Sequence, residues 1–281
     1  MRRTQVLFGS ITDLTPHERG GHAVVGSHGG RQTGAFAARI GLASLLCHDA
    51  GIGLDEAGVA GLTLLEAAGV PAAAVSHLSA RIGDPEDMLA RGRLSRLNAG
   101  AAAAGLKPGM PAALAQRLLQ ALPAGEARPV EPGAGFLRRL LAQPLGIAVT
   151  ALDSASQMEA ADAGAILVTG SHGGLPANDR GRAAKAAARL LVFNDAGVGI
   201  ERAGVARLAV LDAEGIAAVC VDAMTAHIGS ALSTWQRGRL SVVNRRAAAA
   251  GLAPGQSVGT AIRRLLDLDR QDASPLRTGP T

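Results

Sequence analysis

Two halves of this chain carry the same short motifs in the same order. The first half contains GSHGG at residues 26–30, HDAGIG at 48–53, SARIG at 79–83 and RGRLSRLN at 91–98. The second half contains GSHGG at 170–174, NDAGVG at 194–199, TAHIG at 225–229 and RGRLSVVN at 237–244. The first motif recurs after 144 residues and the others after 146, so a single two-residue insertion aligns the halves. This register indicates an ancient tandem duplication.

The repeat divides the chain into two units. We predict a first α/β unit over residues 1–121, a linker over 122–145, a second α/β unit over 146–270 and a disordered tail over 271–281. The linker contains PAGEARPVEPGAG, in which proline, glycine and charged residues carry no periodic apolar pattern. The sequence leaves open whether the units are two facing domains or halves of one sheet, and whether the chain forms a homo-oligomer.

Short apolar runs alternate with helix-like segments in each half. In the second half the predicted strands are GIAVTAL at 146–152, AILVT at 165–169, LLVF at 190–193 and IAAVCV at 216–221. Helices are expected over 154–163 with Ser154 as N-cap, through the alanine-rich segment before Leu190, and from about Glu201 to a C-cap at Gly215. This alternation predicts the α/β class, a βαβ-type unit with a parallel sheet and helices on both faces. Right-handed crossovers then place every strand-to-helix loop at one edge of its sheet.

Composition excludes several classes of function. Of the 281 residues 48% are hydrophobic, yet no apolar stretch reaches the roughly 18 residues of a membrane span and no signal-peptide pattern is present, so a cytoplasmic protein is expected. The net charge of +5 comes from scattered arginines, and with no tyrosine and one tryptophan the sequence argues against nucleic-acid binding. Cys47 and Cys220 are expected to be buried, reduced thiols. Lys107 and Lys185 are the only lysines, which argues against Schiff-base chemistry.

The GSHGG motif combines three glycines with a hydroxyl and an imidazole. Glycines at the start of a helix let backbone N–H groups approach an anion or a developing oxyanion. The alternative is a tight strand-to-helix turn in which the serine is a cap, but a turn does not require the histidine that both copies contain. The candidate residues are Ser27, His28, Gly29 and Gly30 in the first half and Ser171, His172 and Gly173 in the second.

A carboxylate follows the next strand in both halves. Asp49 comes after His48, and Asp195 comes after Asn194. These aspartates are candidates for orienting a histidine, acting as a general base or binding a polar substrate. The structural alternative is an Asx-turn or a helix cap.

The third loop differs most between the halves. His77, Ser79, Arg81 and Asp84 in the first half make it richer in titratable groups than the second half, which has Ala223, His227 and Ser230 in place of His77, Arg81 and Asp84. Arg81 suits a bidentate clamp on a carboxylate or phosphate, and an Arg81–Asp84 ion pair is the alternative. The difference predicts an asymmetric site.

Polar residues also precede the alanine-rich helices. Ser95 and Ser241 are predicted to cap these helices. Asn98 and Asn244 are placed in the first helical turn, where the amide either supports the cap or faces a ligand.

Together these loops favour an enzyme acting on a small polar or carboxylated metabolite. In this hypothesis His28 is the acid or base with Ser27, His48 and Asp49 as further catalytic residues, and hydrolysis of an amide, ester or lactam is preferred over isomerisation or elimination. The nucleophile elbow G-x-S-x-G is missing from these loops, and neither a P-loop nor a dinucleotide fingerprint occurs.

Two alternatives to a cofactor-free enzyme remain open. A metal ion is one, with His28, His48, Asp49, His77 and Asp84 as ligands if the loops converge, although no metal-binding spacing such as H-E-x-x-H is present. The other is a non-catalytic protein whose two lobes close on a small ligand. Loss of turnover without loss of affinity in a His28→Ala variant would identify an enzyme.

Overall fold

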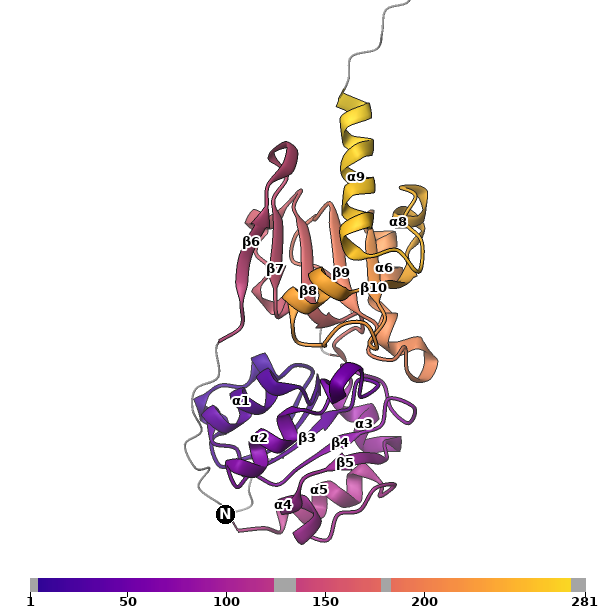
Figure 1. Ribbon diagram of the computed structural model, residues 1–281. Helices are drawn as coiled ribbons and strands as arrows, with labels where there is room; N and C mark the ends of the chain where they lie inside the picture. Colours follow the sequence, from indigo (N-terminus) through magenta and orange to yellow (C-terminus); the bar gives the residue numbers. More distant parts are fainter. Residues whose placement is uncertain (1–4, 124–134, 178–182, 274–281) are drawn as a thin grey trace, which may run out of the picture.

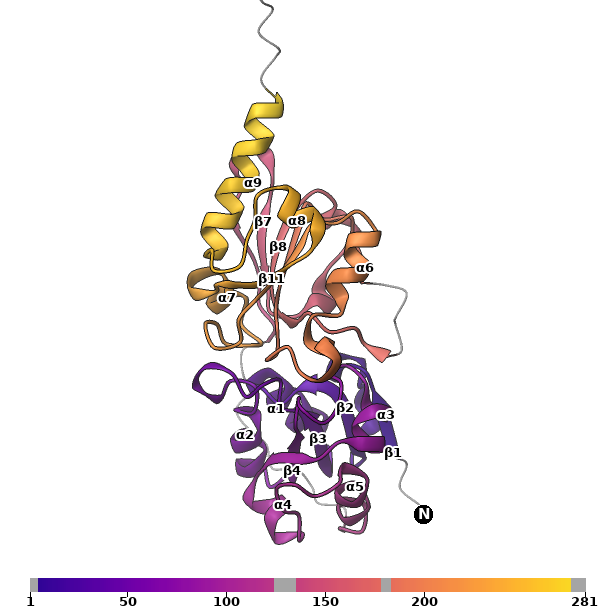
Figure 2. The ribbon, with the colours of Figure 1, turned by 90° about the vertical axis from the view of Figure 1, so that its right-hand side faces the viewer.

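The computed structural model describes residues 5–123, 135–177 and 183–273 and contains two α/β units stacked along the long axis of the molecule (Figures 1 and 2). The first unit has a five-stranded sheet in the order β1-β2-β3-β4-β5. β1 to β4 are parallel and β5 is antiparallel to β4. The strands are β1 (Gln5–Phe8), β2 (His22–His28), β3 (Ser44–His48), β4 (Ala72–Val75) and β5 (Leu94–Leu97).

The second unit has a six-stranded sheet in the order β11-β10-β9-β8-β7-β6. β7 to β10 are parallel, while β6 and β11 run antiparallel at the two edges. The strands are β6 (Arg138–Ala142), β7 (Val149–Leu152), β8 (Ile166–His172), β9 (Leu190–Asn194), β10 (Ala218–Val221) and β11 (Leu240–Val243). β7 to β11 repeat the order of β1 to β5, so the predicted α/β class is confirmed and the two sheet units fit a tandem duplication.

Both sheets are covered on both faces by helices. In the first unit α1 (Arg31–Ile40) and α2 (Gly61–Ala67) pack over one face, and α3 (Pro85–Arg91), α4 (Ala99–Ala103) and α5 (Ala112–Gln120) cover the other. In the second unit α6 (Arg207–Ala213) covers one face, and α7 (Ala231–Arg237), α8 (Arg245–Ala249) and α9 (Val258–Ala273) cover the other. Strand residues alternate between the faces, as Val24 and Val25 do in β2, because successive side chains of a strand point to opposite sides.

Short 3₁₀ turns occupy several connections. They are η1 (Ile11–Asp13), η2 (Pro16–Glu18), η3 (Leu54–Glu56), η4 (Pro144–Gly146), η5 (Ala155–Gln157), η6 (Ala160–Asp162) and η8 (Ile200–Val205). Ser154 is an N-cap as predicted, but residues 154–163 form η5 and η6 rather than one helix. The reason is local: the Ser154 cap bonds Gln157, and the N–H of Met158 returns to the carbonyl of Ala155, which closes a single tight turn.

Two further helix predictions in the second unit differ from the structure. The helix predicted in the alanine-rich segment is absent over residues 183–189, and the part of that segment before residue 183 lies outside the described residues. The next helix, α6, begins at Arg207 rather than near Glu201. Glu201 and Arg202 have positive φ angles, which interrupt an α-helix at that point. Gly215 does end this region with φ +82, as expected of a glycine after a helix.

The ends of the units also differ from the predicted boundaries. β6, at residues 138–142, falls in the segment assigned to the linker, where it pairs with β7 as an edge strand. Of the predicted tail, residues 271–273 continue α9, and residues 274–281 lie outside the described residues, as do linker residues 124–134. Cys47 and Cys220 are buried free thiols, as expected. None of the helices in the described part of the chain combines the length and apolar character needed to cross a membrane.

The caps of the alanine-rich helices are asparagines, not the predicted serines. Asn98 accepts from the N–H of Ala101 and Asn244 from that of Ala247, which makes them the N-caps of α4 and α8. Both amide side chains are buried and also donate to backbone carbonyls, so they are fully occupied in the fold. Ser95 and Ser241 instead lie in β5 and β11, where each hydroxyl donates to a carbonyl of the neighbouring strand.

The carboxyl edges of the two sheets face each other through a pseudo-two-fold contact. At its centre Gly51 packs directly on Gly197, its equivalent in the repeat. Two equivalent backbone hydrogen bonds flank this point, from Leu54 N–H to the Ala223 carbonyl at 2.9 Å and from Ile200 N–H to the His77 carbonyl at 2.8 Å. A small apolar cluster closes the contact between the units, and it consists of Ala50, Ile82, Ala196 and Ile228. The loops of each unit therefore lie at one edge of its sheet, as predicted, and there they contact the loops of the other unit.

Candidate functional site

A cavity of about 430 Å³ lies between the two units and is lined by both GSHGG motifs. Residues at equivalent positions of the repeat face it from the two sides. From the first unit these are Ser10, Thr12, Ser27 and His28, and from the second unit they are Ser154, Ser156, Ser171 and His172. The cavity therefore follows the pseudo-two-fold symmetry of the molecule.

The motif serines are fixed by backbone N–H groups of η1 and η5, the 3₁₀ turns that follow β1 and β7. Ser27 Oγ accepts from the N–H of Ile11 at 2.9 Å, and Ser171 Oγ accepts from the N–H of Ala155 at 2.8 Å. No described residue accepts a hydrogen bond from either serine hydroxyl. Each hydroxyl can therefore donate a hydrogen bond to a molecule in the cavity. These serines are not helix caps, since they belong to β2 and β8.

The motif histidines present neutral donors to the cavity. Nδ1 of His28 accepts from the N–H of Gly30 at 3.1 Å, and Nδ1 of His172 accepts from the N–H of Gly174 at 3.1 Å. An accepting Nδ1 places the ring hydrogen on Nε2, for which no described residue is a partner. Burial lowers the pKa of His28 to about 4, and burial together with Arg207 lowers the pKa of His172 well below its ordinary value. Both rings are thus uncharged Nε2–H donors at neutral pH.

The motif glycines do not supply the predicted anion hole. The N–H of Gly29 donates to the His48 carbonyl and that of Gly173 to the Asn194 carbonyl, while Gly30 donates to the ring of His28. These amides are used within each unit and are not directed at a ligand. The glycines are required for packing instead: a Cβ on Gly29 would lie 2.7 Å from the Cys47 sulfur.

The aspartates of the second loop stabilise turns away from the cavity. Asp49 Oδ1 accepts from the N–H of Gly51 and from both the N–H and Nδ1 of His77. Burial raises the pKa of Asp49, yet the hydrogen bond from His77 and the nearby imidazoles outweigh it and hold that pKa below its usual value. Asp195 makes the equivalent turn bonds but has Ala223 in place of His77, and burial raises its pKa. The histidine that Asp49 orients is therefore His77 and not His28.

His48 and Asn194 perform the same structural task in the two units. His48 Nε2 donates to the Ala80 carbonyl and its Nδ1 accepts from the N–H of Ala50. Asn194 Nδ2 donates to the Ala226 carbonyl and its Oδ1 accepts from the N–H of Ala196. His48 is 1% exposed and both of its ring nitrogens are hydrogen-bonded within the fold. Neither nitrogen is left for the catalytic role that the sequence predicted.

This equivalence gives a testable expectation. We expect His48→Asn to lower the free energy of unfolding by about 1 kcal/mol or less, because asparagine restores both hydrogen bonds. His48→Ala leaves a buried N–H and a buried carbonyl without their partner and is expected to lower it by about 2–4 kcal/mol. Urea denaturation of both variants measures the difference, and equal losses would refute the assigned equivalence.

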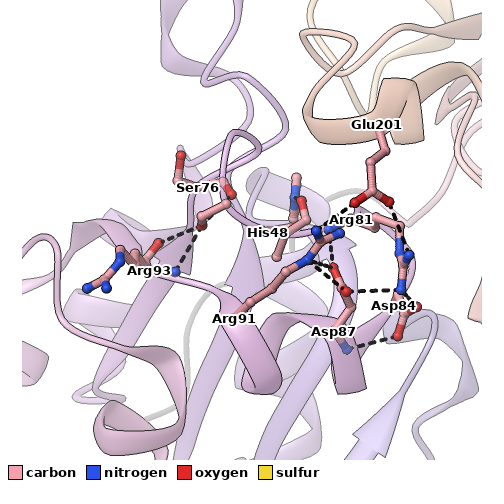
Figure 3. A network of polar contacts seen from close by, with 10 residues as sticks. His48, Ser76, Arg81, Asp84, Asp87, Arg91, Arg93 and Glu201 are labelled. Carbon is pink, nitrogen blue, oxygen red and sulfur yellow. Dashed lines mark hydrogen bonds and ion pairs between the residues drawn. The ribbon is translucent and has the colours of Figure 1, made fainter.

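The third loop forms an ion-pair network rather than a substrate clamp. Arg81 contacts Asp84 at 3.3 Å, Asp87 at 2.9 Å and, across the interface, Glu201 at 3.2 Å, as Figure 3 shows. Glu201 also pairs with Arg91 at 2.6 Å. Arg81 and Asp84 therefore form the ion pair that was the alternative to a substrate clamp. Asp84 is also the N-cap of α3. Ser79 stays within its own loop, donating to the Ser76 carbonyl and accepting from the N–H of Arg93.

The repeat places a second bridge at the equivalent position. His227 replaces Arg81 and Asp55 replaces Glu201, and their side chains lie 2.7 Å apart across the interface. These exposed pairs help to orient the two units but lie outside the cavity lining.

The five candidate metal ligands do not converge. His28 faces the cavity, whereas His48, Asp49, His77 and Asp84 make the contacts described above. Over residues 5–123, 135–177 and 183–273, no group of three or more histidine, cysteine, aspartate or glutamate side chains is arranged to hold a metal ion.

Several residues that line the cavity were not among the site candidates identified from the sequence. Ser10 and Thr12 form a hydroxyl pair 2.8 Å apart, and Ser154 and Ser156 form an equivalent pair at 2.8 Å. Their recurrence after 144 residues was a usable signal. The charged lining residues had no such signal, since none of them recurs with the same residue in the other half, and they are Asp13, Asp153, Lys185 and Arg207.

Comparison of the chain with protein-family models, curated proteins and solved structures found no significant match. The function is therefore argued from the cavity and the residues that line it.

Proposed function

We propose that this protein binds a small polar molecule in the cavity between its two units, held by both GSHGG motifs. The observation that carries the proposal is that two equivalent histidines, His28 and His172, line one cavity with Nδ1 occupied and Nε2–H available. Together with the hydroxyls of Ser27 and Ser171 they form two matched sets of donors. A ligand with acceptor oxygens, such as a carboxylate, phosphate or carbonyl group, satisfies them.

The same geometry favours binding over hydrolysis. General acid–base catalysis works best when the pKa of the group lies near the working pH, and the pKa of His28 lies at about 4. Its Nδ1 already accepts a backbone hydrogen bond, and Asp49 is engaged with His77. A serine nucleophile needs an adjacent base, and no described side chain accepts a hydrogen bond from Ser27. The non-catalytic, two-lobed hypothesis thus has the stronger support.

The experiment is a thermal-shift screen with small metabolites, followed by titration of the hits with His28→Ala and His172→Ala. Alanine removes the Nε2–H donor from the cavity together with the bond from the loop N–H. We expect each variant to weaken binding at least about tenfold, and the melting temperature without ligand measures the separate cost of the lost loop bond. His48→Ala also loses a loop bond but lies outside the cavity lining, so it is the matched control and should bind as the wild type does. Unchanged affinity in both cavity variants would overturn the proposal.

A further inference from the structure

The polar groups that both copies of the repeat place in the cavity are hydroxyls and imidazoles. Ser27 corresponds to Ser171 and His28 to His172, and the hydroxyl pairs described above, one in each unit, correspond as well. Several other lining positions differ between the copies, and examples are Gly9 against Asp153 and Ile11 against Ala155. The duplication has therefore kept the same kind of hydrogen-bonding group on both sides of the cavity.

Each GSHGG motif offers the cavity one N–H and one O–H donor. The histidine Nδ1 and the serine Oγ of each motif already accept hydrogen bonds from backbone N–H groups, which leaves the histidine Nε2–H and the serine hydroxyl hydrogen for a ligand. A carboxylate has two oxygens and only accepts hydrogen bonds, so one carboxylate matches the two donors of one motif. A carboxamide would turn its own N–H hydrogens toward donors. The two motifs therefore match two carboxylates.

The two motif histidines lie close enough for one short molecule to contact both. The ring of His28 reaches the second unit, since a Cβ on Gly229 would lie 3.1 Å from its Cε1. Burial and Arg207 lower the pKa of His172, and the nearby ring of His28 lowers it further. The cavity between them, of about 430 Å³, is at the small end of the range for ligand pockets. A ligand that bridges the motifs is therefore a small one.

The charged side chains of the described lining do not exclude an acid. Lys185 and Arg207 are matched in number by Asp13 and Asp153. Both carboxylates are themselves hydrogen-bonded within the protein: Asp153 accepts from three donors, and Asp13 accepts from the N–H of Ser10. Selection of the ligand therefore depends on the neutral donors of the two motifs.

We propose that the ligand is a short dicarboxylic acid, with one carboxylate bound by each GSHGG motif. This inference rests on the proposed function and adds the ligand class to it. In each unit the histidine Nε2–H and the serine hydroxyl donate to the oxygens of one carboxylate, so that the ligand bridges the two units.

The test is calorimetric titration at neutral pH with malonate, succinate and glutarate, each compared with the monoacid of the same chain length. The monoacids are propionate, butyrate and valerate, in which a methyl group replaces one carboxylate. We expect at least one diacid to bind about tenfold or more tightly than its monoacid, because a methyl end leaves the donors of one motif without an acceptor. Succinamide, the neutral diamide of succinate, should bind about tenfold or more weakly than the best diacid.

Alanine at either motif histidine should remove the advantage of the second carboxylate. In His28→Ala and in His172→Ala we expect the best diacid to bind at most about threefold more tightly than its monoacid. Both acids are measured on the same variant, so a general loss of affinity from the altered loop cancels in the ratio. His48→Ala also loses a loop bond but lies outside the cavity lining, and it should keep the wild-type ratio.

The opposite results overturn the inference. Equal binding of every diacid and its monoacid by the wild type would show that only one acceptor group is recognised. An advantage of the diacid that survives in either cavity variant would show that the second carboxylate binds elsewhere. Succinamide binding as tight as that of the best diacid would show recognition of neutral carbonyls, and no binding of any diacid would exclude the ligand class. The proposed function is decided separately, by the compounds found in the thermal-shift screen and their titration with the same two variants.

Discussion

Gly51→Ala is expected to loosen the contact between the two units and to weaken ligand binding with it. A Cβ at Gly51 would lie 2.8 Å from the Cα of Gly197 and 3.0 Å from its nitrogen, and both are backbone atoms that cannot rotate away. We expect a loss of about 1 kcal/mol from the positive φ and a further loss of about 1–3 kcal/mol from the forced displacement. Urea denaturation measures the sum, and titration measures the loss of affinity.

Gly69→Ala is the matched control for this change. Gly69 has the same φ of +74, but a Cβ there meets no atom within 4 Å. It isolates the conformational part of the effect, which is expected to be about 1 kcal/mol. If both variants lose the same stability and both retain binding, the close Gly51–Gly197 contact is not what holds the two units together.

Acidification is expected to destabilise the folded protein between pH 6.5 and pH 4. The pKa of His28 falls from 6.5 to about 4 because burial disfavours the charged ring, so the unfolded chain takes up a proton that the folded chain does not. Stability from this residue is complete above pH 6.5 and is lost as the pH falls through that window. His28 alone should lower the free energy of unfolding by about 3 kcal/mol at pH 4 relative to pH 7.

The His28→Asn variant isolates this contribution, since all other titratable groups are common to both proteins. At pH 5 the wild type should take up about one proton more on unfolding than the variant does. Denaturation curves collected across the window give this difference directly. Parallel pH profiles for the two proteins would mean that His28 is charged in the folded state and is not the neutral donor assigned to it.

The fold was largely predictable because its signals are local and repeated. Short apolar runs such as AILVT and LLVF carry the strand pattern, and right-handed crossovers place the following loops at one edge of each sheet. The linker prediction missed β6 because an edge strand with no buried residue, such as RRLLA, lacks a continuous apolar run. The segments 154–163 and 183–189 have helical composition but not the contacts that a helix needs.

The site was less predictable because neighbouring motifs use their polar groups in different directions. Ser27 and His28 face the cavity, whereas His48 and Asp49 turn back into their own unit. Sequence places all four at one sheet edge but does not say which atoms the backbone has already engaged. Arg207 belongs to no repeated motif, so the sequence gives no sign that it lines the cavity.

The number of ligands bound per chain tests the shared cavity most directly. Calorimetric titration with the compound that gives the largest thermal shift should yield one molecule per chain, and either His28→Ala or His172→Ala alone should remove that single binding event. Two molecules per chain, or a binding event that survives in one of the variants, would show that the two GSHGG motifs do not act on one ligand.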